Sequence, residues 1–280
     1  MKSRWLSLLI YVVCSLVGIV SLLYQFFLPQ GTTGAQPGSQ RSADMPLMLT
    51  VLLGLALLVL VYEVQGQAMN TKLIALLGVL VAINAALRFL EVAIPGPGGF
   101  SPVFFLIVLT GYVYGARFGF LMGVLTLVVS AILTGGVGPW LPSQMFTAGW
   151  VGMSAATLRP LLLGLHIKGR REEIWILAGF GAFWGMMYGV IMNLWTWPFI
   201  AGPADQYWEY GVGIWETMQR YASYYLLTSF VWDIVRAGGN FMLILGFGMP
   251  ALRTLRRFKR RFTFMYKPTP APVAQSNLSG

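Results

Sequence analysis

The sequence has very few of the residues that enzymes commonly use for catalysis. Among its 280 residues are one cysteine, one histidine and nine acidic residues. The phosphate-binding pattern GxxxxGK followed by Ser or Thr is absent, as are the zinc motif HExxH and the nucleophile motif GxSxG. We therefore predict no catalytic residue, no metal site and no cofactor. We also predict that the chain is not an enzyme and does not hydrolyse ATP alone.

Charged residues are scarce as well, at 10% of the sequence, whereas hydrophobic residues make up 57%. This composition is typical of an integral membrane protein. The apolar runs are continuous and lack the alternation of a transmembrane β-barrel, so we predict an all-α fold with about eight transmembrane helices. The expected spans are residues 5–28, 47–64, 73–93, 102–114, 118–134, 145–165, 174–198 and 222–247.

Basic residues lie almost entirely on one side of this map of spans. Of the 19 Lys and Arg residues, fourteen fall on one side, two (Arg41 and Arg220) on the other, and three inside spans. The positive-inside rule then predicts a multi-pass protein of the plasma membrane with both termini in the cytoplasm. The net charge of +10 is explained by this topology and does not indicate nucleic-acid binding. The basic run 253–261 is either an anchor on anionic lipid headgroups or a docking site for a cytosolic partner.

The composition along the chain divides it into three regions. Residues 1–71 form a two-helix membrane extension, and residues 72–252 form a six-helix core that we expect to bind the substrate. Residues 253–280 form a basic and then disordered cytosolic tail, because three prolines follow Lys267 and no aromatic residue follows Tyr266.

Small residues recur four apart on three of the predicted spans. This spacing places them on one helix face, where a second backbone can approach closely. Each ladder packs either within the monomer or against another membrane subunit. The three ladders are Gly78, Ala82 and Ala86; Gly111, Gly115, Gly119 and Gly123; and Gly181, Gly185 and Gly189.

Polar residues inside the spans also share helix faces. The last span carries Ser229, Asp233, Arg236 and Asn240 at spacings of four, three and four, and the third carries Asn84, Arg88 and Glu91. Such residues are expensive in a bilayer and normally face the interior of the helix bundle. Two interpretations of Asp233 and Arg236 fit, namely a structural ion pair and one polar wall of a solute cavity.

Most of the ten tryptophans lie on the predicted outer half of the protein. An aromatic belt at the membrane interface accounts for many of them, but a belt would populate both faces. Stacking on a flat ligand is the competing explanation. The tryptophans concerned are Trp140, Trp150, Trp195, Trp197, Trp208 and Trp215.

The stretch 100–152 carries a resemblance to a known family. It reads FSPVFFLIVLTGYVYGARFGFLMGVLTLVVSAILTGGVGPWLPSQMFTAGWVG. With its flanks, roughly residues 73–252, it resembles the substrate-binding subunit (S component) of energy-coupling factor vitamin transporters. The resemblance implies six helices and a vitamin or vitamin precursor bound from outside. It also implies an AxxxA face on the first helix that contacts a transmembrane coupling subunit, which sits on two cytosolic ATPase subunits. Ala82-x-x-x-Ala86 matches that face.

The resemblance also places the ligand pocket near the outer face, gated by loops 94–101 and 135–144. Among transported vitamins it is closest to the cobalamin (corrinoid) group. Two extra N-terminal spans and a long aromatic segment at 199–221 depart from the family pattern. The candidate ligand-binding residues are Arg88, Phe100, Trp140, Gln144, Trp150, Asn193, Trp197 and Asp233, and the candidate partner-binding residues are Gly78, Ala82 and Ala86.

Two other function classes are compatible with a multi-pass membrane protein. A membrane-embedded enzyme acting on a lipid or isoprenoid would need a catalytic cluster, and the scarcity of His, Cys and paired acidic residues argues against it. A stand-alone secondary transporter usually has an inverted repeat with broken helices, and the sequence has no convincing repeat.

Overall fold

The computed structural model describes residues 2–23, 26, 54, 71–93, 99–138, 140–167, 169, 171–200, 203, 205–209 and 211–262, and all of their regular structure is helical. The helices are α1 (Lys2–Leu23), α3 (Thr71–Ala93), α4 (Val103–Tyr114), α5 (Ala116–Thr134), α6 (Leu141–Ala155), α7 (Leu158–Gly164), α8 (Arg171–Thr196), α9 (Ile214–Thr228) and α10 (Phe230–Phe262), with a 3-10 turn at Trp197–Phe199. The predicted second span, 47–64, lies outside the described residues except for residue 54.

Four of these helices, α3, α5, α8 and α10, are long and apolar enough to cross a membrane. Residues 11–20 and 103–114 form shorter apolar helices. The prediction of an all-α, multi-pass membrane protein is therefore confirmed.

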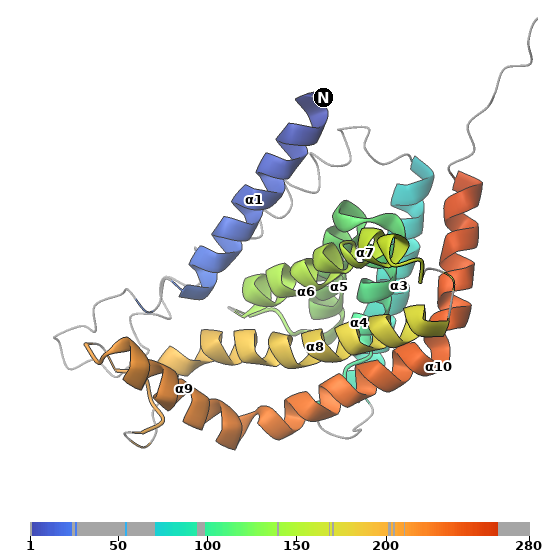
Figure 1. The fold of residues 1–280 in the computed structure, drawn as a ribbon. Helices are drawn as coiled ribbons and strands as arrows, with labels where there is room; N and C mark the ends of the chain where they lie inside the picture. The colour runs from blue at the N-terminus through green and yellow to red at the C-terminus, as the bar shows by residue number, and fades with distance from the viewer. Residues whose placement is uncertain are drawn as a thin grey trace, which may run out of the picture.

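Helix α4 lies at the centre of the bundle. Ten of its twelve residues are buried, as expected for a helix that is apolar on every side. It packs against α5, α6, α8 and α10, while α3 packs on α5 and α4. Helices α8 and α10 run side by side along one face of this core, and α1 lies across the bundle from α3, against α6 (Figure 1).

The glycine ladder on α4 and α5 packs within the chain. A Cβ atom on Gly111 or Gly119 would overlap the backbone of Gly152 in α6, and one on Gly152 would overlap Gly119. Gly115 separates α4 from α5 with φ of 106°, a left-handed conformation that glycine adopts without steric cost. Three helix backbones therefore meet in direct contact at the centre of the fold.

The third ladder holds α8 against α10. A Cβ atom on Gly185 would meet the backbone at Ala237, and one on Gly189 would overlap the carboxylate of Asp233. Gly78 of α3 differs, because a Cβ atom there would have no neighbour within 4 Å among the residues that the structure describes.

The prediction of one span at 222–247 is wrong in its limits. The chain forms α9 and α10 there, and the helix breaks at Ser229, whose φ of −130° is not helical. The Ser229 hydroxyl donates a hydrogen bond of 2.7 Å to the Asn193 side-chain oxygen, which fixes the break against α8. Similarly, the predicted span 145–165 is divided into α6 and α7 by a turn at Ala156 and Thr157.

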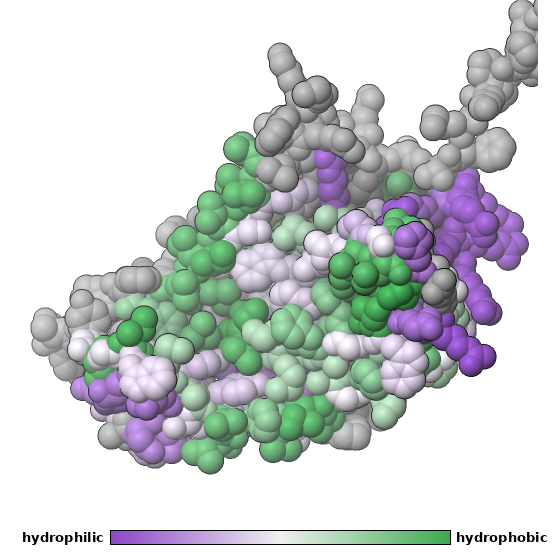
Figure 2. Space-filling view, in the orientation of Figure 1, coloured by the Kyte–Doolittle hydropathy of each residue, from purple (hydrophilic) through white to green (hydrophobic). Residues whose placement is uncertain are grey.

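Helix α10 extends well past the predicted end of the last span. It continues to Phe262, so the basic run 253–261 is helical. Pro250 lies inside this helix and cannot donate a backbone hydrogen bond, which favours a bend. The C-terminal part of α10 turns away from α8, and hydrophilic side chains gather over it (Figures 1 and 2). We call the helical basic run, residues 253–261, the basic end.

Helix α1 is joined to the core through α6 and α5. The Trp150 indole donates a hydrogen bond of 3.1 Å to the Ser15 hydroxyl, and Gly18 lies against the side chains of Trp150 and Phe146. The rings of Tyr11 and Phe120 meet edge to face at 5.4 Å. The N-terminal helix is thus a packed part of the bundle.

Candidate functional site

The polar faces of α3 and α10 approach each other beside the start of α4. We call Arg88, Glu91, Asp233 and Arg236 the charged cluster. Glu91 interacts electrostatically with both Arg88 and Arg236, and its carboxylate accepts a hydrogen bond of 2.9 Å from the Ser101 hydroxyl. The cluster therefore joins residues that lie about half the chain apart in sequence.

Asp233 is the most buried member of the charged cluster, with 2% of its surface exposed. Its carboxylate pairs with the Arg236 guanidinium and accepts a hydrogen bond of 3.0 Å from the Tyr225 hydroxyl. It fills the space left by the absent side chain of Gly189. These contacts hold α8, α9 and α10 together, so Asp233 has a structural role whether or not a ligand also reaches it.

Asn193 and Phe100 border the charged cluster. The Asn193 amide donates a hydrogen bond of 2.8 Å to the Gly189 carbonyl oxygen and accepts one from Ser229. Phe100 lies over Gly239 of α10, where a Cβ atom would overlap its ring. The residues that lead into α4 are therefore packed directly on α10.

Tyr188 of α8 faces the same region. It is 8% exposed, its ring packs on Phe104 at 4.8 Å, and the Arg236 guanidinium lies 5.8 Å from the ring centre. Arg88, Glu91 and Arg236 are all close enough to act on it electrostatically. The sequence analysis missed Tyr188, although it lies on the predicted span 174–198 one residue before a member of a glycine ladder.

An aromatic cluster lies beyond the charged cluster. It consists of buried Trp197, Trp208 and Tyr224, packed with Phe26 and Tyr221. The Trp197 indole donates a hydrogen bond of 2.8 Å to the Gln206 carbonyl oxygen. Tyr221 contacts Trp197 at 5.1 Å and stacks on Tyr225 at 6.3 Å, and Tyr225 bonds to Asp233. A continuous row of rings thus links the aromatic cluster to the charged cluster.

The structure brings together only part of the predicted ligand-binding set. Arg88, Phe100, Asn193 and Asp233 meet at the charged cluster, and Trp197 joins them through the aromatic row. Trp150 does not belong there, because its ring contacts α1.

Two further members of that set lie at the start of α6. Trp140 is 42% exposed and packs on Gly138, and Gln144 is half-buried on the first turn. No described contact joins either residue to the charged cluster. The predicted gating loop 94–101 is described only from residue 99, and the loop 135–144 lacks residue 139.

The predicted partner-binding residues lie on the surface. Gly78, Ala82 and Ala86 of α3 are exposed, and so are their neighbours Val79 and Ile83. This face points away from the packed side of α3, where Leu77, Val81 and Ala85 are buried.

A second buried charge, Glu173, lies at the basic end and was not among the predicted site residues. Glu173 is fully buried, and its carboxylate accepts hydrogen bonds from the Tyr112 hydroxyl, the Arg256 guanidinium and the Gly169 backbone amide, the last at 2.9 Å. Beside it, the Tyr114 hydroxyl donates a hydrogen bond of 2.8 Å to the Leu255 carbonyl oxygen. These contacts fasten the end of α10 to the ends of α4 and α8.

The basic run therefore has two helix faces. Arg256 points to the core, and so does Lys259, whose ammonium group donates to the Val113 carbonyl oxygen. Arg253 and Arg257 are exposed on the other side of the helix. The spacing of the basic residues alone could not have shown which of them face the core. Arg256 pairs with Glu173, which is far away in the sequence and lies beside it only in the folded protein.

Replacing Glu173 with glutamine should lower stability, because the substitution removes the buried charge that pairs with Arg256. Breaking a buried pair costs about 3–5 kcal/mol, and solvent access to Arg256 reduces this to about 1–3 kcal/mol. Thermal unfolding of the detergent-solubilised protein would measure the change. Glu172→Gln is the matched control, because Glu172 is exposed on the same helical turn. Equal melting temperatures for the two variants would contradict this role.

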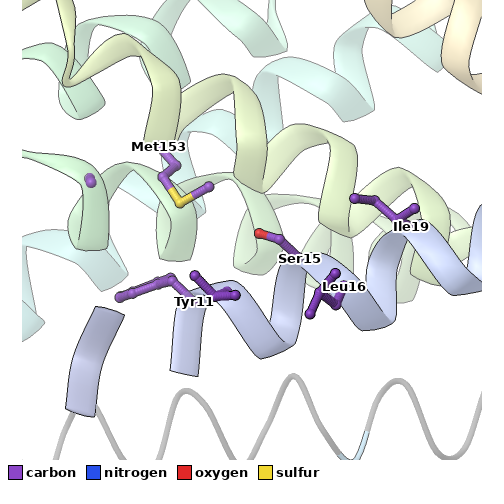
Figure 3. A pocket seen from close by; sticks show the side chains of 7 residues that line it. Tyr11, Ser15, Leu16, Ile19 and Met153 are labelled. Carbon is purple, nitrogen blue, oxygen red and sulfur yellow. The ribbon is translucent and has the colours of Figure 1, made fainter. Parts of the chain in front are cut away.

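Two open grooves are described, and neither is lined by the charged cluster. One has a volume of about 360 Å³ and lies between α1 and α6, lined by Tyr11, Ser15, Leu16, Ile19 and Met153 among others (Figure 3). It is apolar and lies on surface that a bilayer would cover. The other lies beside Arg220 of α9, which pairs with Glu209 and Glu216. The described residues contain no group of three His, Cys, Asp or Glu side chains that could hold a metal ion.

Comparison with known proteins gives one match. Residues 72–247, well over half of the chain, match the family model described as "ECF transporter, substrate-specific component". No curated protein and no solved structure matches the chain. The matched region contains the charged cluster, Glu173 and the exposed face of α3.

Proposed function

Because the chain belongs to the ECF transporter substrate-specific component family, we propose that it is the substrate-binding membrane subunit of an ATP-driven importer for a vitamin or vitamin-like compound. The family match over residues 72–247 is the observation that carries this proposal. The absence of a phosphate-binding loop from the sequence fits it, because two cytosolic ATPase subunits would supply the energy.

The substrate would bind at the charged cluster and the neighbouring aromatic row. Intramembrane charges normally mark a substrate or ion pathway when they face the interior of a bundle. Here two arginines, two carboxylates and Tyr188 converge from three helices, and aromatic rings adjoin them on one side. Polar groups for orientation beside aromatic surface are what a small-molecule site requires.

The coupling subunit would bind the exposed face of α3 formed by Gly78, Ala82 and Ala86. Small side chains let a second membrane helix approach closely, and no described neighbour fills the space above Gly78. Helix α1 leaves this face open, because it packs on α6. The extra N-terminal helix is therefore compatible with docking on α3.

The basic end would lie in the cytoplasm of a plasma-membrane protein, together with both termini. Arg253 and Arg257 would then contact anionic lipid headgroups, as the positive-inside rule predicts. The charged cluster, near the other end of α10, would lie toward the outside, where the substrate enters.

Tryptophan fluorescence offers a direct test of the proposed function. The purified protein should show quenching on binding one compound of a vitamin panel, with cyanocobalamin as the first to test, because Trp197 and Trp208 lie beside the proposed site. The chain should also co-purify with a coupling subunit and two ATPases when they are expressed together. No response across the panel and no co-purification would contradict the proposal.

A further inference from the structure

We propose that the substrate carries an anionic oxygen group, a carboxylate or a phosphate, which binds the Arg88 guanidinium and the Tyr188 hydroxyl. This inference rests on the proposed function and names the chemical class of its substrate. It follows from which members of the charged cluster already have partners.

The two acidic members have hydrogen-bond donors within the protein. Asp233 accepts from Arg236 and Tyr225, and Glu91 accepts from Ser101. Arg236, in turn, has Asp233 as its counter-ion and lies against the Tyr188 ring. Three of the four charges are therefore engaged without any ligand.

Arg88 is the exception in the charged cluster. Arg88 is half-buried, and its guanidinium interacts electrostatically with Glu91 but makes no hydrogen bond or close ion pair with any residue that the structure describes. The Tyr188 hydroxyl also makes no hydrogen bond within the described part of the chain, although Tyr188 is 8% exposed. Neither donor is fully enclosed, so both can reach a ligand, and a guanidinium and a hydroxyl that lie together without a protein acceptor are suited to bind one.

The chemistry of the two donors defines that acceptor. A guanidinium offers several N–H groups in a planar arrangement that matches the two oxygens of a carboxylate or phosphate. The hydroxyl of Tyr188 adds a third donor. A cationic substrate group placed at these two donors would instead be repelled by Arg88 and would find no acceptor in the guanidinium.

One buried acceptor lies deeper in the same region. The side-chain oxygen of Asn240, one turn further along α10 from Arg236, is fully buried and has no hydrogen-bond donor, while its amide nitrogen donates to the Arg236 carbonyl oxygen at 2.8 Å. A substrate that has an N–H or O–H group as well as the anion would satisfy both ends of the site. This orphan acceptor is an independent sign that the region is built for a polar ligand.

Matched pairs of compounds test the inference in the full-length protein. Each pair has one member with the anion and one without it. Suitable carboxylate pairs are biotin and biotinamide, nicotinate and nicotinamide, and pantothenate and panthenol. A suitable phosphate pair is riboflavin 5′-phosphate and riboflavin. Dissociation constants would be measured by tryptophan quenching or calorimetry.

The wild-type protein should bind the anionic member of one pair about 10- to 100-fold more tightly than its neutral partner, the range expected for hydrogen bonds to a charged group. Arg88→Met should reduce that preference to about one by weakening only the anionic member, and Tyr188→Phe should reduce it in part. A merely structural defect would weaken both members equally. Arg220→Met is the matched control at the same end of the protein and should keep the full preference.

Two results would overturn the inference. The first is equal or tighter binding of the neutral member by the wild-type protein, and the second is an anion preference that survives Arg88→Met. Tight binding of a neutral or cationic vitamin alone would overturn the anion and leave the proposed function standing. Binding of no compound in the panel would contradict both.

Discussion

Replacing Ala82 with leucine should abolish uptake of the substrate by cells while the purified protein binds that substrate with an unchanged dissociation constant. Ala82 lies in the middle of the exposed face of α3, between Gly78 and Ala86. A leucine there would hold a partner helix away by the width of a side chain, and membrane helices without close backbone contact lose most of their attraction. We expect uptake to fall by about tenfold or more, because assembly with the coupling subunit would fail.

The separation of the two readouts is what makes this test specific. Ala82 is exposed, whereas Val81 and Ala85 on the adjoining face of α3 are buried, so a side chain added at Ala82 should leave the core unaffected. Uptake of a labelled substrate, co-purification with the coupling subunit and substrate binding would be measured on the same variant. Gly179→Leu on α8 is the control, because that glycine is also exposed and a Cβ atom there would meet no described residue within 4 Å. Normal assembly of Ala82→Leu would refute docking on this face.

Hydropathy was sufficient to predict α3 and α5, because each membrane crossing needs a long apolar run whatever its neighbours are. The runs 73–93 and 118–134 match α3 and α5 within two residues at each end. Hydropathy was not sufficient for the region after Tyr221, where the apolar sequence continues through the break between two helices. The break at Ser229 depends on a hydrogen bond to Asn193, 36 residues away, and no local pattern records such a contact.

The polar faces were predicted more reliably than the individual site residues. Spacing alone placed Asp233 and Arg236 on one face, and burial cost predicted that this face points inward. The tryptophans lacked such a constraint, since their amphipathic rings suit a ligand, a lipid interface or a helix contact equally. Trp150 proved to be a contact to α1, and Trp197 belongs to the aromatic cluster. Only tertiary packing separates these roles.

Replacing Gly152 with leucine should prevent the protein from folding. Its Cα lies against the Gly119 backbone, and a Cβ atom would overlap the Gly119 carbonyl oxygen. Overpacking against side chains typically costs about 1–3 kcal/mol, because side chains can rotate away. Here backbone meets backbone, and Gly111 closes the third side, so relief would require separating α4, α5 and α6. We expect a loss above about 4 kcal/mol, a large part of the stability of a typical domain.

The absence of a monodisperse peak in size-exclusion chromatography of the Gly152→Leu variant in detergent would show this loss. Gly78→Leu is the matched control, since the same change on α3 places the new side chain where no described residue lies within 4 Å. It should yield a folded protein that fails only to assemble with the coupling subunit. Both glycines lie within apolar helices, and the opposite outcomes follow from what each one touches. A folded, substrate-binding Gly152→Leu protein would mean that α5 and α6 do not meet at this point.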